Sequence, residues 1–548
     1  ERYAGLTAPV QFSHPKGFYD DGFLLTLSCE TPGATIRYTL DGRTPTETTG
    51  QRYIAPIPIQ ASVAVCANAF CPDHLSTTPT THSFLFDVDA AQRSLPTIAL
   101  VGDPQESLYE PNGVLAVSGG VYPPPLGIWQ PDDTGDYNNV IARGKAYERP
   151  VFMEIMDHPE VADFAAGVGL RTHGNLRELL QRTDGPWDEP LERASFRLYF
   201  RSDYGPSELE RTLFPKSEVD TYEQLVIRGG HNDPVNPFVK DEFGRRIFLD
   251  MGQCTARGDF FNLYINGSYK TYVNVVERCD DDFFRRWFGS DAAWDIVKAS
   301  GSSWRARGWD WKLPEDRQAD VAPPSDPDTS DDELYLKEQF LTLMDLVRFE
   351  DCAQPEVYEE IKQRLKVTSF IDYLILNLYL ANTDWPTFNW DFAREQSPNG
   401  EFIAFAWDLE GSMSVSPTAY NGIWQGPADN FEGGGGLMRQ EAPVPWLYRG
   451  LRRNEEFRRR FCKRVRKHFY NDGALTDANL TAHYEELRNT MAAVLPEMDP
   501  HPGEVFLPKR RGFMLRSFAQ EGLFAPAKPE VEIAANALEF HNPNRSEE

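Results

Sequence analysis

Hydrophobic and polar residues alternate over short stretches in the first ninety residues. TIRYTL (35–40) alternates and is followed by the turn DGRTP, and PIPIQASVAVCANAF (56–70) supplies two further runs rich in strand-forming residues. A spacing of two, with turn residues between the runs, is typical of half-buried strands. We therefore expect a small all-β sandwich over residues 1–90.

Further along the chain, the apolar residues follow a helical spacing. In SFIDYLILNLYL (369–380) they recur at i, i+3, i+4, i+7 and i+8, which predicts a buried, central helix. The stretch VPWLYRGLRRNEEFRRRFCKRVRKHFY (444–470) predicts another helix with a basic solvent face. Longer, mixed elements indicate that the chain is multidomain, with a large α+β domain over 91–525. We expect residues 526–548 to be a tail or a linker to a further module.

Composition narrows the class of protein and its partners. The 548 residues are 41% hydrophobic, enough for a large core, and their formal net charge of −28 repels nucleic acid and anionic lipid. No apolar run approaches the roughly 20 residues of a membrane span, so we expect no transmembrane segment. The opening ERYAGLTAP has no apolar leader and indicates a mature or trimmed secreted chain.

The seven cysteines are sparse and odd in number. This pattern does not indicate a disulfide framework, although Cys66 and Cys71 are close enough in sequence to pair locally. No CxxC pairs with a second CxxC or with an HxxxH, so a structural zinc site has little support.

The stretch NTDWPTFNWDFAREQSPNGEFIAFAWDLEGS (382–412) carries the candidate chemistry. Its first Asn, Asp and Pro end the predicted helix, and NWDFAREQ and EFIAFAW are expected to be two strands joined by SPNG. With the turn at Pro-Asn, Asn389 lies opposite Asp408; with the turn at Asn-Gly, Asp391 lies opposite Asp408. Either register gathers oxygen ligands at the open end of the hairpin.

Three polar residues of this stretch have two interpretations. Asp408 follows the apolar run FIAFAW, and an ionised carboxylate there needs a partner such as Mg²⁺. Asp384 and Asn389 have the D-x-x-x-x-N spacing that kinase catalytic loops use for an acid and a metal ligand. The alternative is that all three are turn, strand-start and cap residues.

The same stretch resembles a known family. ANTDWPTFNWDF, IAFAWDLEGS and LYINGSYKTYVNVVERCDDDFFRRWFG are similar to the CotH family of spore-coat, atypical kinases, from about residue 95 to at least Ser412. The resemblance implies an atypical protein-kinase-like fold that transfers phosphoryl groups from ATP to a protein acceptor with Mg²⁺, or with Mn²⁺ as the alternative metal. Carried over by position, Asp384 would be the catalytic acid, and Asn389 and Asp408 would hold the metal.

The N-terminal region resembles a module of other enzymes. PVQFSHPKGFYDDGFLLTLSCETPGATIRYTLDGRTPT and the strands that follow are similar to the chitobiase/hexosaminidase C-terminal-type β-sandwich, over residues 9 to about 87. Such modules accompany secreted enzymes and usually carry no catalytic residues. The resemblance implies an accessory role, with glycan contact as a further expectation, and a secreted or cell-envelope location.

The residues that would hold the nucleotide are less defined. CotH-like proteins usually carry a Lys just before a Ser-aromatic pair, where this chain has Ala194. Glu277 either anchors a phosphate-binding base, pairs with Arg278, or caps the following helix. The candidate cofactor-binding residues are Arg171, Arg193, Arg228, Glu277 and Lys298, with Arg197 and Arg278 as further bases near a phosphate.

Two functions follow from these observations. The first is a secreted kinase acting on Ser or Thr of an extracellular or envelope protein. The second is a non-catalytic pseudokinase scaffold or carbohydrate-binding surface protein, favoured by Ala194 and by the accessory module. Trp304, Trp309 and Trp311 would then form a sugar platform, or else they are buried anchors of their loop.

Overall fold

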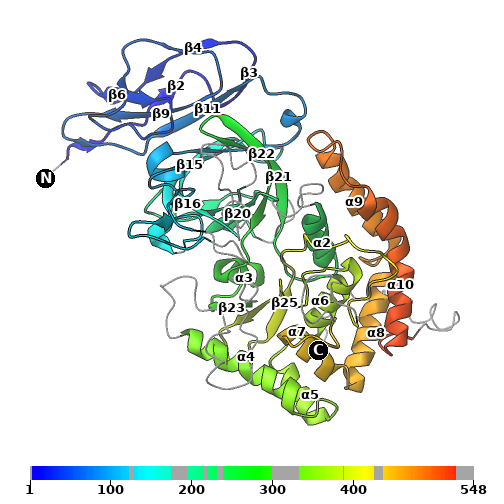
Figure 1. Ribbon diagram of the computed structural model, residues 1–548. Coiled ribbons are helices and arrows are strands. Elements are labelled where there is room, and N and C mark those ends of the chain that lie inside the picture. The colour runs from blue at the N-terminus through cyan, green and yellow to red at the C-terminus, as the bar shows by residue number, and fades with distance from the viewer. Residues whose placement is uncertain are drawn as a thin grey trace.

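The computed structural model describes residues 3–121, 129–142, 144–174, 194–214, 217, 219–230, 239–298, 332–386, 388–424 and 436–525. The side chains of Lys298 and of residues 332–338 are outside this description, as are Arg193 and the three tryptophans at 304, 309 and 311. Figure 1 shows a β-rich module at the N-terminus, a β-barrel next to it, and a set of helices on the far side of the barrel.

The N-terminal module is built from short strands, as expected. Its main sheet has the order β3-β11-β9-β6-β7, and β2–β5 and β4–β8 are antiparallel pairs. The bounds are β2 Gln11–Phe12, β3 Gly17–Tyr19, β4 Phe23–Leu25, β5 Leu27–Ser28, β6 Thr35–Thr39, β7 Gln51–Arg52, β8 Ile57–Ile59, β9 Val63–Phe70 and β11 Thr80–Phe86. Leu25, Val65 and Phe84 are buried between these sheets. Cys66 and Cys71 are free thiols, so the local disulfide is not formed.

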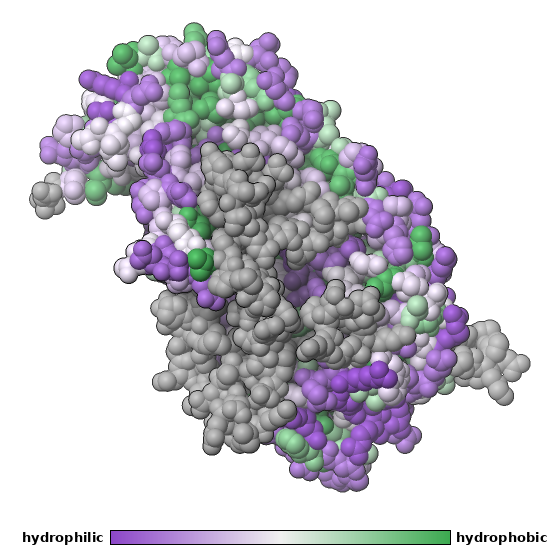
Figure 2. All heavy atoms as spheres, in the orientation of Figure 1, coloured by the Kyte–Doolittle hydropathy of each residue, from purple (hydrophilic) through white to green (hydrophobic). Residues whose placement is uncertain are grey.

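The module packs directly on the barrel. Leu85 of β11 joins Ala99, Met156 and Tyr264 in one apolar cluster across the contact. The buried carboxylate of Glu154 accepts a hydrogen bond from the main-chain N–H of Ser83 over 3.0 Å. Figure 2 shows hydrophobic atoms gathered on the face of the module that points away from the barrel. Leu24 and Ile54 are among the exposed large apolar side chains of the module.

Seven strands close the barrel in the order β12-β15-β16-β17-β20-β22-β21. They are β12 Thr97–Val101, β15 Arg149–Met156, β16 Phe164–Thr172, β17 Phe196–Tyr199, β20 Gln224–Arg228, β21 Gly258–Ile265 and β22 Ser268–Glu277. Neighbours are antiparallel except β12 and β21. The β21–β22 hairpin turns at Asn266 and Gly267, whose φ angles of 48° and 81° are the left-handed values that an Asn-Gly turn requires.

Smaller strand pairs and a short helix border the barrel. The pairs are β13 Val117–Ser118 with β14 Tyr137–Asn138, and β18 Leu209–Glu210 with β19 Thr221–Tyr222. Helix α3 (Asp281–Phe288) follows β22 and begins at Asp280, whose side chain accepts a hydrogen bond from the main-chain N–H of Phe283. It ends at Gly289, in the left-handed conformation.

Helix α6 (Val367–Leu380) lies at the centre of the helical part and is buried along almost its whole length. Its position confirms the helix that the apolar spacing over 369–380 predicts. The helices around it are α2 Val239–Asp250, α4 Asp332–Phe349, α5 Pro355–Lys362, α7 Pro443–Leu451, α8 Glu455–Phe469, α9 Asp477–Met491 and α10 Leu507–Gln520. None of the helices in the described ranges is long and apolar enough to cross a membrane.

The single helix predicted over 444–470 is wrong, because two helices occupy this stretch. Helix α7 ends at Leu451, and α8 starts at Glu455. The Asn454 side chain accepts hydrogen bonds from the main-chain N–H groups of Glu456 and Phe457, which starts a new helix at that point.

A three-stranded sheet lies between the barrel and α6. Its strands are β23 Trp294–Lys298, β24 Asp391–Glu395 and β25 Phe402–Phe405, with β24 in the middle. Ser369 Oγ of α6 donates to the carbonyl of Ala404 over 3.0 Å and ties the sheet to the central helix. The end of β25 is therefore held where the barrel and the helices meet.

Candidate functional site

Asp384 lies in the turn that follows helix α6. The helix ends at Ala381, whose φ of 52° is left-handed, and the buried Trp385 anchors the turn. The Asp384 side chain remains exposed. An acid placed just after a buried helix, with its carboxylate toward solvent, can reach a substrate without leaving a rigid support.

A buried arginine, Arg510, bonds to the main chain at the end of α6, next to this turn. Arg510 Nε donates to the carbonyl of Tyr379 over 2.7 Å, and Nη2 donates to the carbonyl of Leu378, both in the last turn of α6. Arg510 Nη1 donates to the carbonyls of Pro417 and Tyr420 over 3.0 and 2.5 Å. The guanidinium thereby neutralises the negative end of α6 and holds residues 417–420 beside it.

The Asp384 turn is also joined to the segment after Asp408. Both the main-chain N–H and the hydroxyl of Thr383 donate to the carbonyl of Gly411, over 3.2 and 3.0 Å. A Cβ atom at Gly411 would lie 3.3 Å from Asp384 Oδ2, so the close approach depends on the missing side chain. The two segments that carry the candidate residues therefore move as one unit.

Asn389 and Asp408 lie side by side. Asn389 Nδ2 donates to the main-chain carbonyl of Asp408 over 3.3 Å, and Tyr373 Oη donates to the Asn389 carbonyl over 3.1 Å. Both residues have left-handed φ angles, 52° for Asn389 and 57° for Asp408. Such angles are uncommon outside glycine and cluster at functional sites, where the surroundings hold them.

The two registers expected for the hairpin are both wrong. Asp391 pairs with Phe405, and Asp408 lies beyond the end of β25. The reason is the wide loop 396–401, which Arg394 holds open by donating to the carbonyls of Gly400 and Ser397 over 3.0 and 3.1 Å. A tight two-residue turn at SPNG is therefore not formed, although Asn389 and Asp408 still lie next to each other at the open end.

Arg228 connects the barrel to this region. Its Nη2 lies 2.8 Å from Asp408 Oδ1 and 2.5 Å from Glu410 Oε1, and its Nη1 lies 3.4 Å from Asp241 Oδ2. Burial acts to lower the pKa of Arg228, but these three carboxylates raise it well above its ordinary value. The guanidinium is thus a permanent cation. It ties the end of β20, where Arg228 lies, to the first turn of α2 and to the segment after β25.

Asp241 and Glu410 were not predicted from the sequence. Burial acts to raise the pKa of Asp241, but Arg228 and Arg245 lower it, and the Leu409 N–H also donates to its carboxylate. Burial raises the pKa of Glu410 to about 7, against the pull of Arg228. Acidic residues are common in the first turn of a helix, so the sequence showed no sign of a role for Asp241. Only its contact with Arg228, at the end of β20, reveals that role.

Trp407 lies among basic side chains from the barrel. The Arg228 and Arg278 guanidinium groups lie 5.1 and 5.9 Å from its ring centroid, and the His173 ring lies 6.5 Å away. Arg171, predicted as a cofactor-binding base, instead lies 5.2 Å from the Tyr199 ring in the barrel wall. Two arginines and a histidine therefore surround the ring of Trp407, the residue before Asp408.

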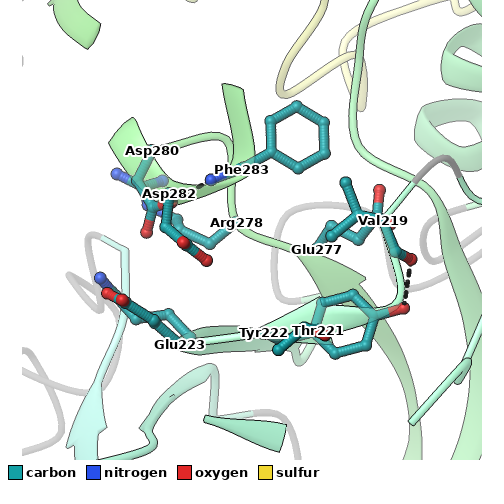
Figure 3. Close-up of a pocket in the computed structure, with 10 residues that line it drawn as sticks. Val219, Thr221, Tyr222, Glu223, Glu277, Arg278, Asp280, Asp282 and Phe283 are labelled. Atoms are coloured by element: carbon teal, nitrogen blue, oxygen red, sulfur yellow. Dashed lines mark hydrogen bonds between the residues drawn. The ribbon is translucent and has the colours of Figure 1, made fainter. Parts of the chain in front are cut away.

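Glu277 does not pair with Arg278 and does not cap α3. Its carboxylate accepts hydrogen bonds from the Ser217 hydroxyl and, over 2.8 Å, from the Arg257 N–H. Figure 3 shows Glu277 on the side of Val219 and Tyr222, while Arg278 lies near Asp280. Burial raises the pKa of Glu277 to about 7. The cavity between these residues, about 10 Å³, has room for a water molecule and not for a nucleotide.

The remaining predicted residues are placed as follows. Lys298 pairs through its backbone with Asp391 at the end of β23, and its side chain is outside the description. Arg193 lies outside the described residues. Ala194, where a lysine would be expected, is 1% exposed and packs in the barrel core. A base at position 194 would therefore need a different local packing.

The residues at Asp408 fit a hard divalent cation. Asp408 pairs with Arg228 through Oδ1, and 34% of its side chain is exposed. The Asn389 amide lies next to it and bonds to its main-chain carbonyl. Mg²⁺ is commonly held by one or two carboxylates together with water and substrate phosphates. Among the described residues, no group of three or more His, Cys, Asp or Glu forms a ready-made metal cage.

Comparison with known proteins gives two matches. Residues 170–506, more than half of the chain, match the family model described as CotH kinase protein. Residues 14–81 match the model of the chitobiase/beta-hexosaminidase C-terminal domain. No curated protein matches the chain.

Proposed function

The chain belongs to the CotH kinase protein family, and from this premise we propose that it transfers the γ-phosphoryl group of ATP to a Ser or Thr hydroxyl of a protein, with Mg²⁺ as cofactor. The observation that carries the proposal is the junction at Asp408. There the Arg228 cation lies 2.8 Å from the Asp408 carboxylate, and the Asn389 side-chain amide donates to the Asp408 main-chain carbonyl over 3.3 Å. The Asp384 turn is tied to the same segment through Thr383 and Gly411.

Arg228 and Asp241 support the comparison with protein kinases. In those enzymes a lysine on a strand pairs with a glutamate on the next helix, and both must be in place with the metal-binding aspartate. Here Arg228 ends β20, Asp241 lies in the first turn of α2, and Asp408 is the third member. The kinase-like fold is part of this proposal and is inferred from that arrangement.

Each residue then has one role. Asp384 accepts a hydrogen bond from the attacking hydroxyl and orients it, because its carboxylate is the exposed acid of the turn. Asn389 and Asp408 supply the oxygen ligands of the metal. When bound, Mg²⁺ neutralises negative charge that develops on the transferred group. Arg228 keeps Asp408 in place, and Arg510 keeps the α6 terminus in place.

We propose a secreted or envelope-associated location and an extracellular or envelope protein as acceptor. The support is the N-terminal module, which matches a domain of carbohydrate-active enzymes and is compatible with glycan contact.

The test is phosphate transfer from γ-labelled ATP to dephosphorylated casein, a general Ser/Thr acceptor. We expect labelling by the wild type with Mg²⁺, and at least a hundredfold slower labelling by Asp384→Asn with ATP binding retained. Mn²⁺ in place of Mg²⁺ tests the alternative metal. Equal labelling by the variant would place the catalytic acid elsewhere.

A non-catalytic scaffold is the second candidate, and Ala194 favours it. The buried alanine stands where the family usually has a lysine, so no base from this position can bind the phosphates. The accessory module also exposes apolar side chains on its outer face. A wild type that binds ATP with Mg²⁺ but labels neither casein nor itself would favour this function.

A further inference from the structure

Two arginines lie against Trp407, and they differ in what neutralises them. Arg228 shares three carboxylates, as described above. The Arg278 guanidinium lies 5.9 Å from the same ring, yet it makes no ion pair or hydrogen bond with the residues that the structure describes. The Arg278 side chain is only partly exposed, so water can solvate its charge only in part.

Arg197 is a second cation of this kind. Its Nη2 donates to His173 Nδ1 over 3.0 Å, and its Nη1 lies 3.4 Å from the Tyr199 hydroxyl. Its Nε is buried and has no hydrogen-bond partner among the described residues. Neither neighbour carries a negative charge that would neutralise the guanidinium.

The two cations act on each other. Burial and, next, the charge of Arg197 together lower the pKa of Arg278 to about 10, against the opposing charges of Asp280 and Asp391. Elsewhere in the described structure, buried arginines such as Arg245 and Arg464 are in ion pairs with carboxylates. Asp280 acts on both arginines through its charge, but neither guanidinium is in an ion pair among the described residues. Two partly buried arginines without such a pair are unexpected in a chain of net charge −28.

We propose that Arg197 and Arg278 form an oxyanion subsite on the Trp407 side of the Asp408 junction, and that it receives a phosphate group of a polyphosphate chain. Planar guanidinium groups match the oxygens of phosphate in pairs, and such charge-assisted hydrogen bonds are strong. Arg228 then has a structural role, holding Asp408, and the binding of phosphate belongs to the other two arginines. That the polyphosphate is part of ATP rests on the proposed function; the subsite does not.

The test is calorimetric titration with inorganic tripolyphosphate at low ionic strength, with EDTA to exclude metals. We expect Arg278→Gln and Arg197→Gln each to weaken binding about tenfold to a hundredfold, and Arg278→Lys to weaken it less because the charge is kept. Arg285→Gln is the matched control. It removes one positive charge from nearby α3, where Arg285 pairs with Asp281, and should change affinity less than twofold. Circular dichroism and thermal unfolding establish that each variant is folded.

Tripolyphosphate affinity that is absent in the wild type, or equal in wild type, Arg278→Gln and Arg197→Gln, overturns the subsite. If Arg278→Gln weakens binding and Arg197→Gln does not, Arg197 is not part of the subsite and the proposal of a paired site is overturned. A second titration with ATP and Mg²⁺ separates this proposal from the kinase activity. Tripolyphosphate binding that depends on Arg278, without any metal-dependent ATP binding, supports the subsite and contradicts the proposed function.

Discussion

Arg228 Nη2 lies 2.8 Å from Asp408 Oδ1, and this contact joins the last residue of a barrel strand to the proposed metal ligand. The same guanidinium reaches Asp241 on the first turn of α2. Three parts of the fold therefore meet at a single side chain that is buried. The position of Asp408 depends on this side chain as much as on the strand that precedes it.

Replacing Arg228 should destabilise the protein strongly. Arg228→Met removes the cation and leaves Asp241, Asp408 and Glu410 without it, and breaking a buried ion pair from one side typically costs about 3 to 5 kcal/mol. Urea unfolding measures the change in the free energy of unfolding. The matched control is Arg285→Met, because Arg285 and Asp281 form an exposed pair that is worth at most about 1 kcal/mol. An equal loss of unfolding free energy in the two variants would show that the buried network stabilises the protein no more than an exposed ion pair does.

Arg510 should be needed for a stable α6 terminus. Arg510→Met leaves four main-chain carbonyls without their donor, and we expect a loss of about 3 kcal/mol in the free energy of unfolding. The neighbouring Arg511 donates to a single carbonyl, that of Phe469, so Arg511→Met should cost less than about half as much. Denaturant unfolding of both variants checks the difference. A larger loss for Arg511→Met would contradict this role of Arg510.

Glu277 should make stability fall as the pH rises. Its pKa is raised from an ordinary value of 4.5 to about 7 by burial. Between these two values the unfolded chain is ionised while the folded protein keeps the proton, so folding becomes less favourable with rising pH, by at most about 3 kcal/mol. The effect is absent below pH 4.5 and complete above pH 7.

Glu277→Gln should remove this part of the pH dependence. The amide can still accept from the Arg257 N–H and donate to the Ser217 hydroxyl, so the variant should fold. Urea unfolding at pH 5.0 and pH 7.5 measures the slope for both proteins. An unchanged slope in Glu277→Gln would mean that another group is responsible.

The sequence pattern predicted those elements whose cause is local. The apolar spacing placed the central helix, because the spacing of apolar residues acts over a few residues. The register after β24 was wrong since it depends on Arg394, whose contacts with the loop are made through space. The predicted long helix failed at Asn454 for a local reason that the pattern contained, a cap residue inside a charged run.

The candidate site was predictable only in part. Asp384, Asn389 and Asp408 could be chosen from their spacing and their place after apolar runs. In the structure Asn389 bonds to Asp408, and the Asp384 turn is tied to Gly411 through Thr383, while their roles stay a prediction. Asp241 and Trp407 could not be chosen, because their roles arise from contacts between distant segments. Of the predicted bases, Arg228 joins the site, whereas Arg171 lies in the barrel wall against Tyr199.

The most direct test of the central claim is calorimetric titration of ATP into the wild type and Asp408→Asn, with and without Mg²⁺. The asparagine keeps the shape of the side chain and removes its charge, and Asp472→Asn at an exposed turn is the control. We predict that Mg²⁺ strengthens ATP binding by the wild type and the control at least tenfold, and that Asp408→Asn loses this gain. Equal binding by Asp408→Asn with Mg²⁺, or wild-type affinity that Mg²⁺ does not change, would contradict a metal and phosphate site at Asp408.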